Sequence, residues 1–128
     1  MVEAALTISL ALFTVMGMIE LGVALFTYQS MTEGARRALR YAVVHPYDVD
    51  SIHNVAVYGN SAGTGSSFGG LSRTTVTVER QSIDSVNSVI RVVVTLPSYQ
   101  FFTPLFPSVP FSMSTTAVRV AEGMGVTT

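Results

Sequence analysis

Residues 4–19 (AALTISLALFTVMGMI) form a mostly apolar stretch near the start of the chain, and this stretch restricts the possible folds more than any other feature. Only Thr7, Ser9, Thr14 and Gly17 interrupt its hydrocarbon side chains. Its sixteen residues include no charge and no proline. A helix of this length and composition crosses most of a bilayer. A helix on the surface of a soluble domain would have a polar face, and this one has none on any side. We therefore expect it to lie in lipid or among copies of itself.

The helical pattern continues beyond this stretch to about residue 44. From Leu21 onward, apolar and small residues recur at steps of three and four, which is typical of an amphipathic helix. The opposite side carries three arginines, interpreted as a solvated face, and Glu33 is placed to pair with Arg36 or Arg37. Pro46 ends the helix because proline disfavours helical backbone in the residue before it. About forty helical residues predict a rod of roughly 60 Å.

Two carboxylates stand in the apolar region. Glu3 is in the first turn, and the apolar sequence after it would bury its charge. A buried unpaired charge costs several kcal/mol. We therefore predict that Glu3 pairs with a free α-amino group of its own or a neighbouring chain, the alternative being a solvated position among lipid headgroups. Glu20 lies between Gly17 and Gly22, which allow close helix approach or local unwinding. Glu20 either has a polar partner or marks the exit of the helix from the membrane.

The chain divides into an apolar helix half at residues 1–24, an amphipathic half at 25–46 and a C-terminal β domain at 47–128. Alternating patterns predict strands at residues 73–81, 88–96 and 112–122, with a hairpin between the first two. One face of this sheet is apolar, and the amphipathic half of the helix can cover it. The predicted fold is therefore α+β, with a long N-terminal helix packed by its second half on a small antiparallel sheet of three or four strands. In the last strand, Thr116, Val118 and Val120 oppose Thr115, Ala117 and Arg119.

Two connections lie outside these strands. Residues 59–70 (GNSAGTGSSFGG) predict a surface loop, and residues 52–58 before it fit either a turn of helix or an edge strand. Residues 97–111 (PSYQFFTPLFPSVPF) contain too much proline for a central strand. So many apolar side chains exceed the needs of a small core, which favours contact with another subunit over a plug at the end of the sheet. The candidate contact residues are Tyr99, Phe101, Phe102, Leu105, Phe106 and Phe111.

The composition argues against several functions. Seven arginines, no lysine and eight carboxylates give no clustered basic surface for nucleic acid. The chain has no cysteine, and Asp48 and Asp50 lack the glycine and later glutamate of a calcium loop, so we predict no metal site. Two histidines, scattered carboxylates and the absence of a nucleophile motif predict no catalytic site, no cofactor and no enzymatic activity.

The chain resembles the TadE-like pseudopilins of tight-adherence pilus systems, a branch of the type IV filament superfamily. The resemblance is carried by Val2 and Glu3 and by the segments GMIELG at 17–22, MTEGARRALRYA at 31–42 and STTAVR at 114–119. It implies a leader removed by a prepilin peptidase, storage in the inner membrane, and ATPase-driven extraction by the pilus assembly machinery into a helical homo-oligomer. It also implies that Glu3 meets a neighbour's N-terminal amine, although the family commonly has this glutamate at the fifth position with an aromatic residue after it. The first basic residue is Arg36, so we expect a basic leader to precede Met1 before processing.

Three functions remain open at this point. The leading hypothesis is a structural subunit of an extracellular pilus that mediates adhesion. The alternatives are a minor pseudopilin that stays anchored in the inner membrane and primes assembly, and a membrane-anchored module that binds through its aromatic or glycine-rich loop.

Overall fold

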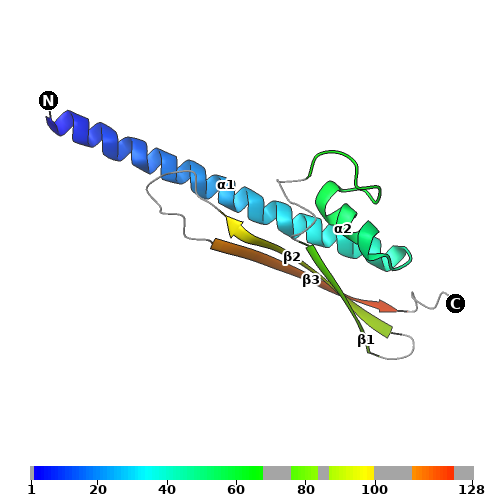
Figure 1. Ribbon diagram of the computed structural model, residues 1–128. Helices are drawn as coiled ribbons and strands as arrows, with labels where there is room; N and C mark the ends of the chain where they lie inside the picture. Colours follow the sequence, from blue (N-terminus) through cyan, green and yellow to red (C-terminus); the bar gives the residue numbers. More distant parts are fainter. Residues whose placement is uncertain (1, 68–75, 84–86, 100–110, 123–128) are drawn as a thin grey trace.

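The computed structural model describes residues 2–67, 76–83, 87–99 and 111–122, and the helices, strands and contacts of the fold are those of these ranges. Two helices, α1 (Val2–Val44) and α2 (Val49–Tyr58), precede three strands, β1 (Val76–Ser82), β2 (Asn87–Tyr99) and β3 (Phe111–Glu122) (Figure 1). The second half of α1 lies along the sheet, and its first half extends beyond the rest of the molecule (Figure 1). The predicted α+β fold is confirmed.

Helix α1 has 43 residues, which gives a length of about 65 Å at 1.5 Å per residue. It ends at Val44, two residues before Pro46, as the sequence predicts. Its last turn is fixed by a hydrogen bond from the backbone N–H of His45 to the carbonyl of Tyr41 at 3.0 Å. The rings of these two residues stack with their centroids 4.1 Å apart.

Helix α2 resolves the ambiguity that the sequence left at residues 52–58. Asp48 caps its N-terminus, since its carboxylate accepts hydrogen bonds from the backbone N–H groups of Asp50 and Ser51 at 3.3 and 3.2 Å. At the other end Gly59 adopts φ 78°, and its N–H donates to the carbonyl of Val55 at 3.1 Å. A left-handed residue at this position is a common helix stop, and glycine adopts it without a steric penalty.

The sheet is antiparallel with strand order β1-β2-β3. The predicted hairpin between β1 and β2 is present, and the N–H of Ile83 donates to the carbonyl of Asn87 at 3.0 Å where the turn begins. Strand β2 continues to Tyr99, so the prediction that no central strand enters residues 97–111 is wrong for its first three residues. The strand tolerates Pro97 because its register with β3 shifts between Leu96 and Tyr99.

The core lies between the sheet and the two helices. Small residues on α1 allow its backbone to come close to the sheet, and α2 packs against both α1 and β1. The most buried members are Met31, Ala35, Ala38 and Ala42 from α1, Ile52, Ala56 and Val57 from α2, and Val76, Ile90, Val92, Val94 and Met113 from the strands. The members from α1 and from the first two strands agree with the apolar faces that the sequence predicts for these elements. Leu25 and Tyr28, which the helical spacing places on the same apolar face of α1, are instead 54% and 45% exposed.

On β3, the side with the larger apolar residues is not the side that is buried. Val118 and Val120 point away from α1 and are 53% and 51% exposed. The opposite side faces the helix with Met113 buried and Thr115 half-buried, and the Thr115 hydroxyl lies 3.3 Å from that of Thr32 on α1. The position of the helix, more than side-chain hydrophobicity, therefore decides which side of this strand is inside.

Tyr47, in the loop after α1, contacts Arg80 of β1 through its side chain. Its ring packs against the core, and the guanidinium carbon of Arg80 lies 5.2 Å from the ring centroid, within the range of a cation–π contact. Burial raises the pKa of Tyr47 above its ordinary value of 10.0, and the positive charge of Arg80 opposes this shift. The hydroxyl is therefore protonated at neutral pH.

Candidate membrane and assembly surface

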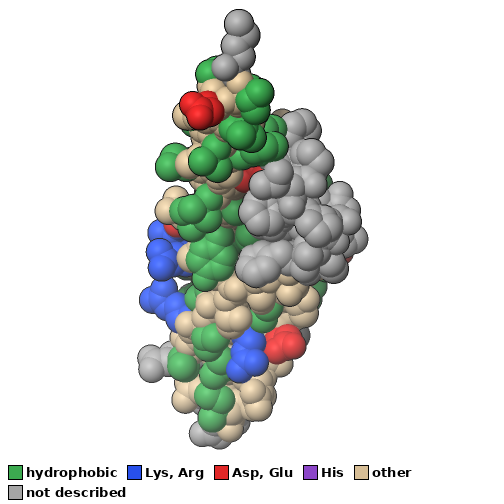
Figure 2. All heavy atoms as spheres, turned by 90° about the vertical axis from the view of Figure 1, so that its left-hand side faces the viewer, with side chains coloured by type: hydrophobic (Ala, Val, Ile, Leu, Met, Phe, Trp, Pro, Cys, Tyr) green, Lys and Arg blue, Asp and Glu red, His purple; other side chains and the backbone are tan. Residues whose placement is uncertain are grey.

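The first half of α1, taken from here on as residues 2–19, presents a contiguous apolar surface. Residues 2–16, 18 and 19 are all exposed. Hydrophobic side chains cover this protruding part of the molecule in Figure 2. Among the described helices, α1 alone is long and apolar enough to cross a membrane, with a mean hydropathy of 2.1 over its most apolar 18 residues.

The polar side chains within this half are satisfied by the helix itself. The hydroxyls of Thr7, Ser9 and Thr14 donate to the carbonyls of Glu3, Ala5 and Leu10, at 2.8, 2.8 and 2.9 Å. Each bond runs from residue i to residue i−4 along the helix. Polar groups that are paired in this way do not need water, which suits a helix surrounded by lipid or by other helices.

Burial changes abruptly at Glu20. Its neighbours Ile19 and Leu21 are each 61% exposed, whereas Glu20 is 8% exposed. Glu20 begins the buried stripe that continues through Ala24, Thr27 and Met31, at the spacing of one helix face. Its side chain therefore lies on the side of the folded domain. Glu3, by contrast, is exposed in the first turn, and the assembly roles of both carboxylates stay predictions.

Gly17 and Gly22 are not required by packing within the chain. A Cβ atom built on either residue has no neighbouring atom within 4 Å among the described residues, apart from the local backbone of the helix. Helix α1 also runs through both positions without a break. Of the two roles that the sequence suggests, local unwinding is absent here, and close approach of another helix is the one that stays open.

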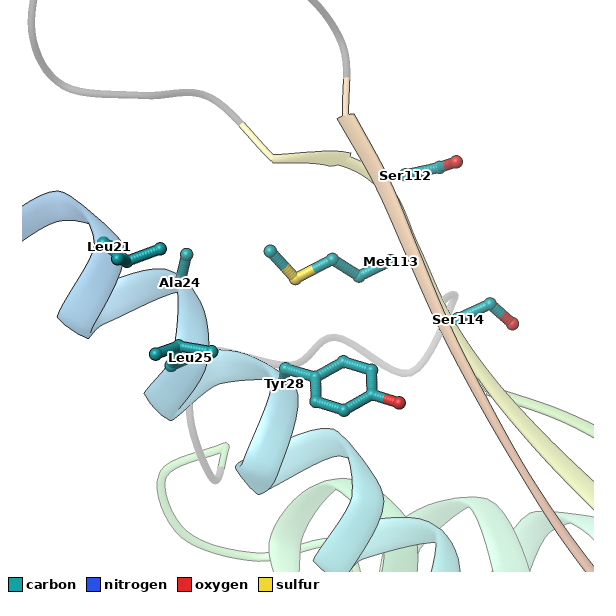
Figure 3. A pocket seen from close by; sticks show the side chains of 7 residues that line it. All are labelled: Leu21, Ala24, Leu25, Tyr28, Ser112, Met113 and Ser114. Atoms are coloured by element: carbon teal, nitrogen blue, oxygen red, sulfur yellow. The ribbon is translucent and has the colours of Figure 1, made fainter.

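A groove opens where the exposed half of α1 gives way to the buried half. It has a volume of about 500 Å³, and an almost wholly apolar wall. In Figure 3 the side chain of Met113 extends from β3 toward α1, while Ser112 and Ser114 point away from it. Its lining consists of Leu21, Ala24, Leu25 and Tyr28 on α1 and Ser112, Met113 and Ser114 on β3.

A charged cluster lies further along α1, on the side away from the sheet. Glu33 Oε1 lies 3.8 Å from Arg37 Nε and 3.3 Å from Arg40 Nη2. The pair with Arg37 is one of the two that the sequence predicts. Sequence reasoning missed Arg40, although an extended arginine can reach across two helical turns. Basic side chains gather on this side in Figure 2, and their partial exposure fits the predicted solvated face.

The carboxylate of Asp48 caps a helix, which explains the acidic spacing at residues 48 and 50 without a metal ion. In the described ranges no three histidine, cysteine or acidic side chains gather as metal ligands. Of the residues predicted for subunit contact, Phe101, Phe102, Leu105 and Phe106 lie outside those ranges, and Tyr99 and Phe111 are described only as backbone. That contact stays a prediction.

Comparison with known proteins bears on this same helix. The model of a family described as TadE-like protein matches residues 1–40, which include the whole exposed half of α1 and most of the packed half. This match confirms the resemblance that the sequence indicates over the helix. No curated protein and no solved structure gives a significant match.

Proposed function

We propose that this chain is a structural subunit of a tight-adherence pilus, stored in the inner membrane and polymerised at the cell surface through the first half of α1. The match of residues 1–40 to the TadE-like family connects the chain with such pilus systems. The separation of the molecule into an apolar protruding helix and a small folded domain supports a polymer with helices inside and domains outside (Figure 1).

The observation that carries the proposal is the exposure of residues 2–19. Eighteen helical residues extend about 27 Å, and the large apolar side chains of this segment are exposed. Contiguous apolar surface of this size is rarely left in water. Lipid and neighbouring helices are the two environments that can cover it on all sides. Transfer from one to the other buries little additional apolar area, so packing and polar contacts decide the direction.

Two features of the helix fit the polymerised state. The space around Gly17 and Gly22 would allow a neighbouring helix to approach closely. Glu3 in the first turn would pair with the α-amino group of a neighbouring subunit once the helices leave the lipid. Extraction from the membrane then exchanges a solvated carboxylate for an ion pair.

A minor, priming subunit is the second candidate. The observation in its favour is the matched family itself, because the chain resembles pseudopilins that start assembly. Such a subunit would use the same apolar helix but stay largely in the membrane.

The two candidates differ in the composition of filaments sheared from producing cells. If the chain is the main subunit, mass spectrometry finds it as their dominant component. Leu10→Arg places a charge on the exposed half and should abolish its incorporation, while Val118→Arg on the outer side of the sheet should not. Gly17→Leu is a control for membrane insertion. It keeps the helix apolar, so the chain should still insert, but the larger side chain blocks close approach of a neighbouring helix. Trace amounts in filaments, with most of the chain in the membrane fraction, would favour the priming subunit or an anchored binding module.

A further inference from the structure

The folded domain and the apolar surface of α1 overlap along the helix. Exposed apolar side chains continue on the helix through Leu25, Phe26 and Tyr28. One side of the helix is nevertheless covered from Glu20 onward. From Glu20 to Phe26 the helix rises about 9 Å, so the domain lies beside apolar helix surface over roughly this distance.

The charges on α1 limit where a membrane can sit. Between Glu3 and Glu33 the only charged residue is Glu20, which the domain shields. A hydrocarbon layer of about 30 Å needs about 20 helical residues. If the hydrocarbon layer is placed as close to the N-terminus as the charges allow, it begins after Glu3 and ends near Val23. Any other placement between the outer charges moves the layer toward the domain.

Each of these placements puts the groove at the edge of the bilayer or within it. Leu21 lies within the hydrocarbon in every case. In the placement closest to the N-terminus, Leu25 lies two residues, or about 3 Å, beyond the boundary, and the other placements bring Leu25 closer to the hydrocarbon or into it. Phe26 and Tyr28 follow at the level where aromatic side chains commonly meet lipid headgroups. The groove is continuous with this surface, since Leu21 and Leu25 belong to both.

Strand β3 brings the domain to the same level. Met113 faces Leu21 and Ala24 across the groove, so the first residues of β3 lie beside the last apolar turns of the span (Figure 3). From there β3 runs in the same general direction as α1, toward its C-terminal end (Figure 1). The start of the strand is therefore the end of the sheet that is nearer the membrane.

We propose that the groove between α1 and β3 is a lipid-contact surface, through which the start of β3 enters the edge of the bilayer and the acyl chains of the adjacent leaflet fill the space around Leu21, Leu25 and Met113. Lipid is the occupant because the groove continues the surface that the span presents to lipid. This inference rests on the membrane-held stage of the proposed function and not on polymerisation. The domain is then held against the membrane at two points, the helix and the end of the sheet.

Tryptophan fluorescence tests this contact, because the chain contains no tryptophan of its own. The full chain is reconstituted in phosphatidylcholine and phosphatidylglycerol vesicles with single substitutions Leu10→Trp, Ser112→Trp or Val118→Trp. All three positions are exposed, so the substitutions leave the core intact. Ser112 and Val118 share one side of β3 and are about 20 Å apart at 3.3 Å per residue. The quencher is a bromine or nitroxide on the acyl chain near the headgroup.

We expect strong quenching of Leu10→Trp, clear quenching and a blue-shifted emission for Ser112→Trp, and little of either for Val118→Trp. Equal behaviour of Ser112→Trp and Val118→Trp would overturn the lipid contact while leaving the membrane-held helix intact. A blue shift of Ser112→Trp without lipid quenching would also overturn it and would indicate that protein, from a second copy or another part of the chain, lies beside the start of β3 in place of lipid. An unquenched Leu10→Trp would contradict the membrane-held stage itself, and the contact with it.

Discussion

The two halves of α1 belong to one continuous helix but have opposite surroundings. Residues 2–19 carry large apolar side chains on every side, and nearly all of them are exposed. From Glu20 to Val44 the helix presents a stripe of small residues to the sheet, including Ala24, Ala35 and Ala38. The second half thus obtains its apolar contacts from the same chain, whereas the first half must obtain them from lipid or from other copies.

This difference suggests how stability and assembly are separated within one element. Small residues in the packed half allow the helix backbone to approach the sheet closely. The larger side chains at this contact come from the sheet, for example Val92 and Val94. Large residues in the exposed half supply bulk to a partner outside the chain. Substitutions in the packed half should therefore change folding, and substitutions in the exposed half should change location and assembly.

The largest expected effect on folding comes from Met31→Ala. Met31 is fully buried, and truncation of a buried methionine costs about 2–5 kcal/mol through lost contacts and the cavity that remains. Urea unfolding in detergent micelles measures this loss. Leu12→Ala removes a side chain of similar size from the exposed half and should change the unfolding free energy by less than about 0.5 kcal/mol. Equal losses in the two variants would contradict the division of the helix.

The next effect concerns location. Leu10→Arg places a charge in the middle of the exposed half, at a cost of about 2.5–3.5 kcal/mol for insertion into a bilayer. Membrane fractionation with carbonate extraction should show a loss of the integral form. Val118→Arg adds the same charge to the outer side of the sheet and should leave the integral fraction unchanged. If both variants stay integral to the same extent, residues 2–19 are not the membrane span.

A smaller effect is expected at the cap of α2. Asp48→Ala removes the acceptor for the N–H groups of Asp50 and Ser51 and should lower the unfolding free energy by about 1 kcal/mol. Asp48→Asn keeps a capping oxygen and should restore most of this loss in the same urea experiment. If asparagine destabilises the protein as much as alanine does, the carboxylate has a role other than capping.

Two glycines, one within α1 and one at the end of α2, separate an effect of similar size from no effect. Gly59 has φ 78°, so Gly59→Ala forces a left-handed alanine and should cost about 1 kcal/mol. The new Cβ would also lie 3.2 Å from Nη1 of Arg37, which can move. At Gly17 the conformation is helical and the space is open, so Gly17→Ala should not destabilise the domain. A clear loss of stability in Gly17→Ala would show that this glycine serves the fold of the single chain.

The sequence predicts most of the helix and sheet because their signals are local. Proline after the helix sets its end, and alternation of apolar residues sets the strands. Residues 52–58 (IHNVAVY) stayed ambiguous because valine and isoleucine favour strands while their spacing also fits a helix. Asp48 before this segment and Gly59 after it are the capping signals that could have resolved it.

Other features depend on contacts between distant segments and could not be predicted. The burial of Glu20 requires knowledge of which side of α1 meets the domain. The outward direction of Val118 follows from the pairing of Arg91 with Val118 and of Val92 with Ala117, which sets the side of β3 that faces the helix. Pro97 enters β2 only because the pairing is irregular there. The groove beside Met113 combines residues about ninety positions apart, which no local pattern indicates.

Electron cryomicroscopy of filaments sheared from the producing cells tests the central claim most directly. The claim is that the exposed half of α1 is covered by neighbouring subunits after assembly. We predict a helical lattice of this chain in which residues 2–19 form the central bundle, Gly17 and Gly22 face neighbouring helices, and the sheets lie outside. Filaments built from this chain with residues 2–19 on their surface, or filaments in which the chain does not form the lattice, would contradict the account.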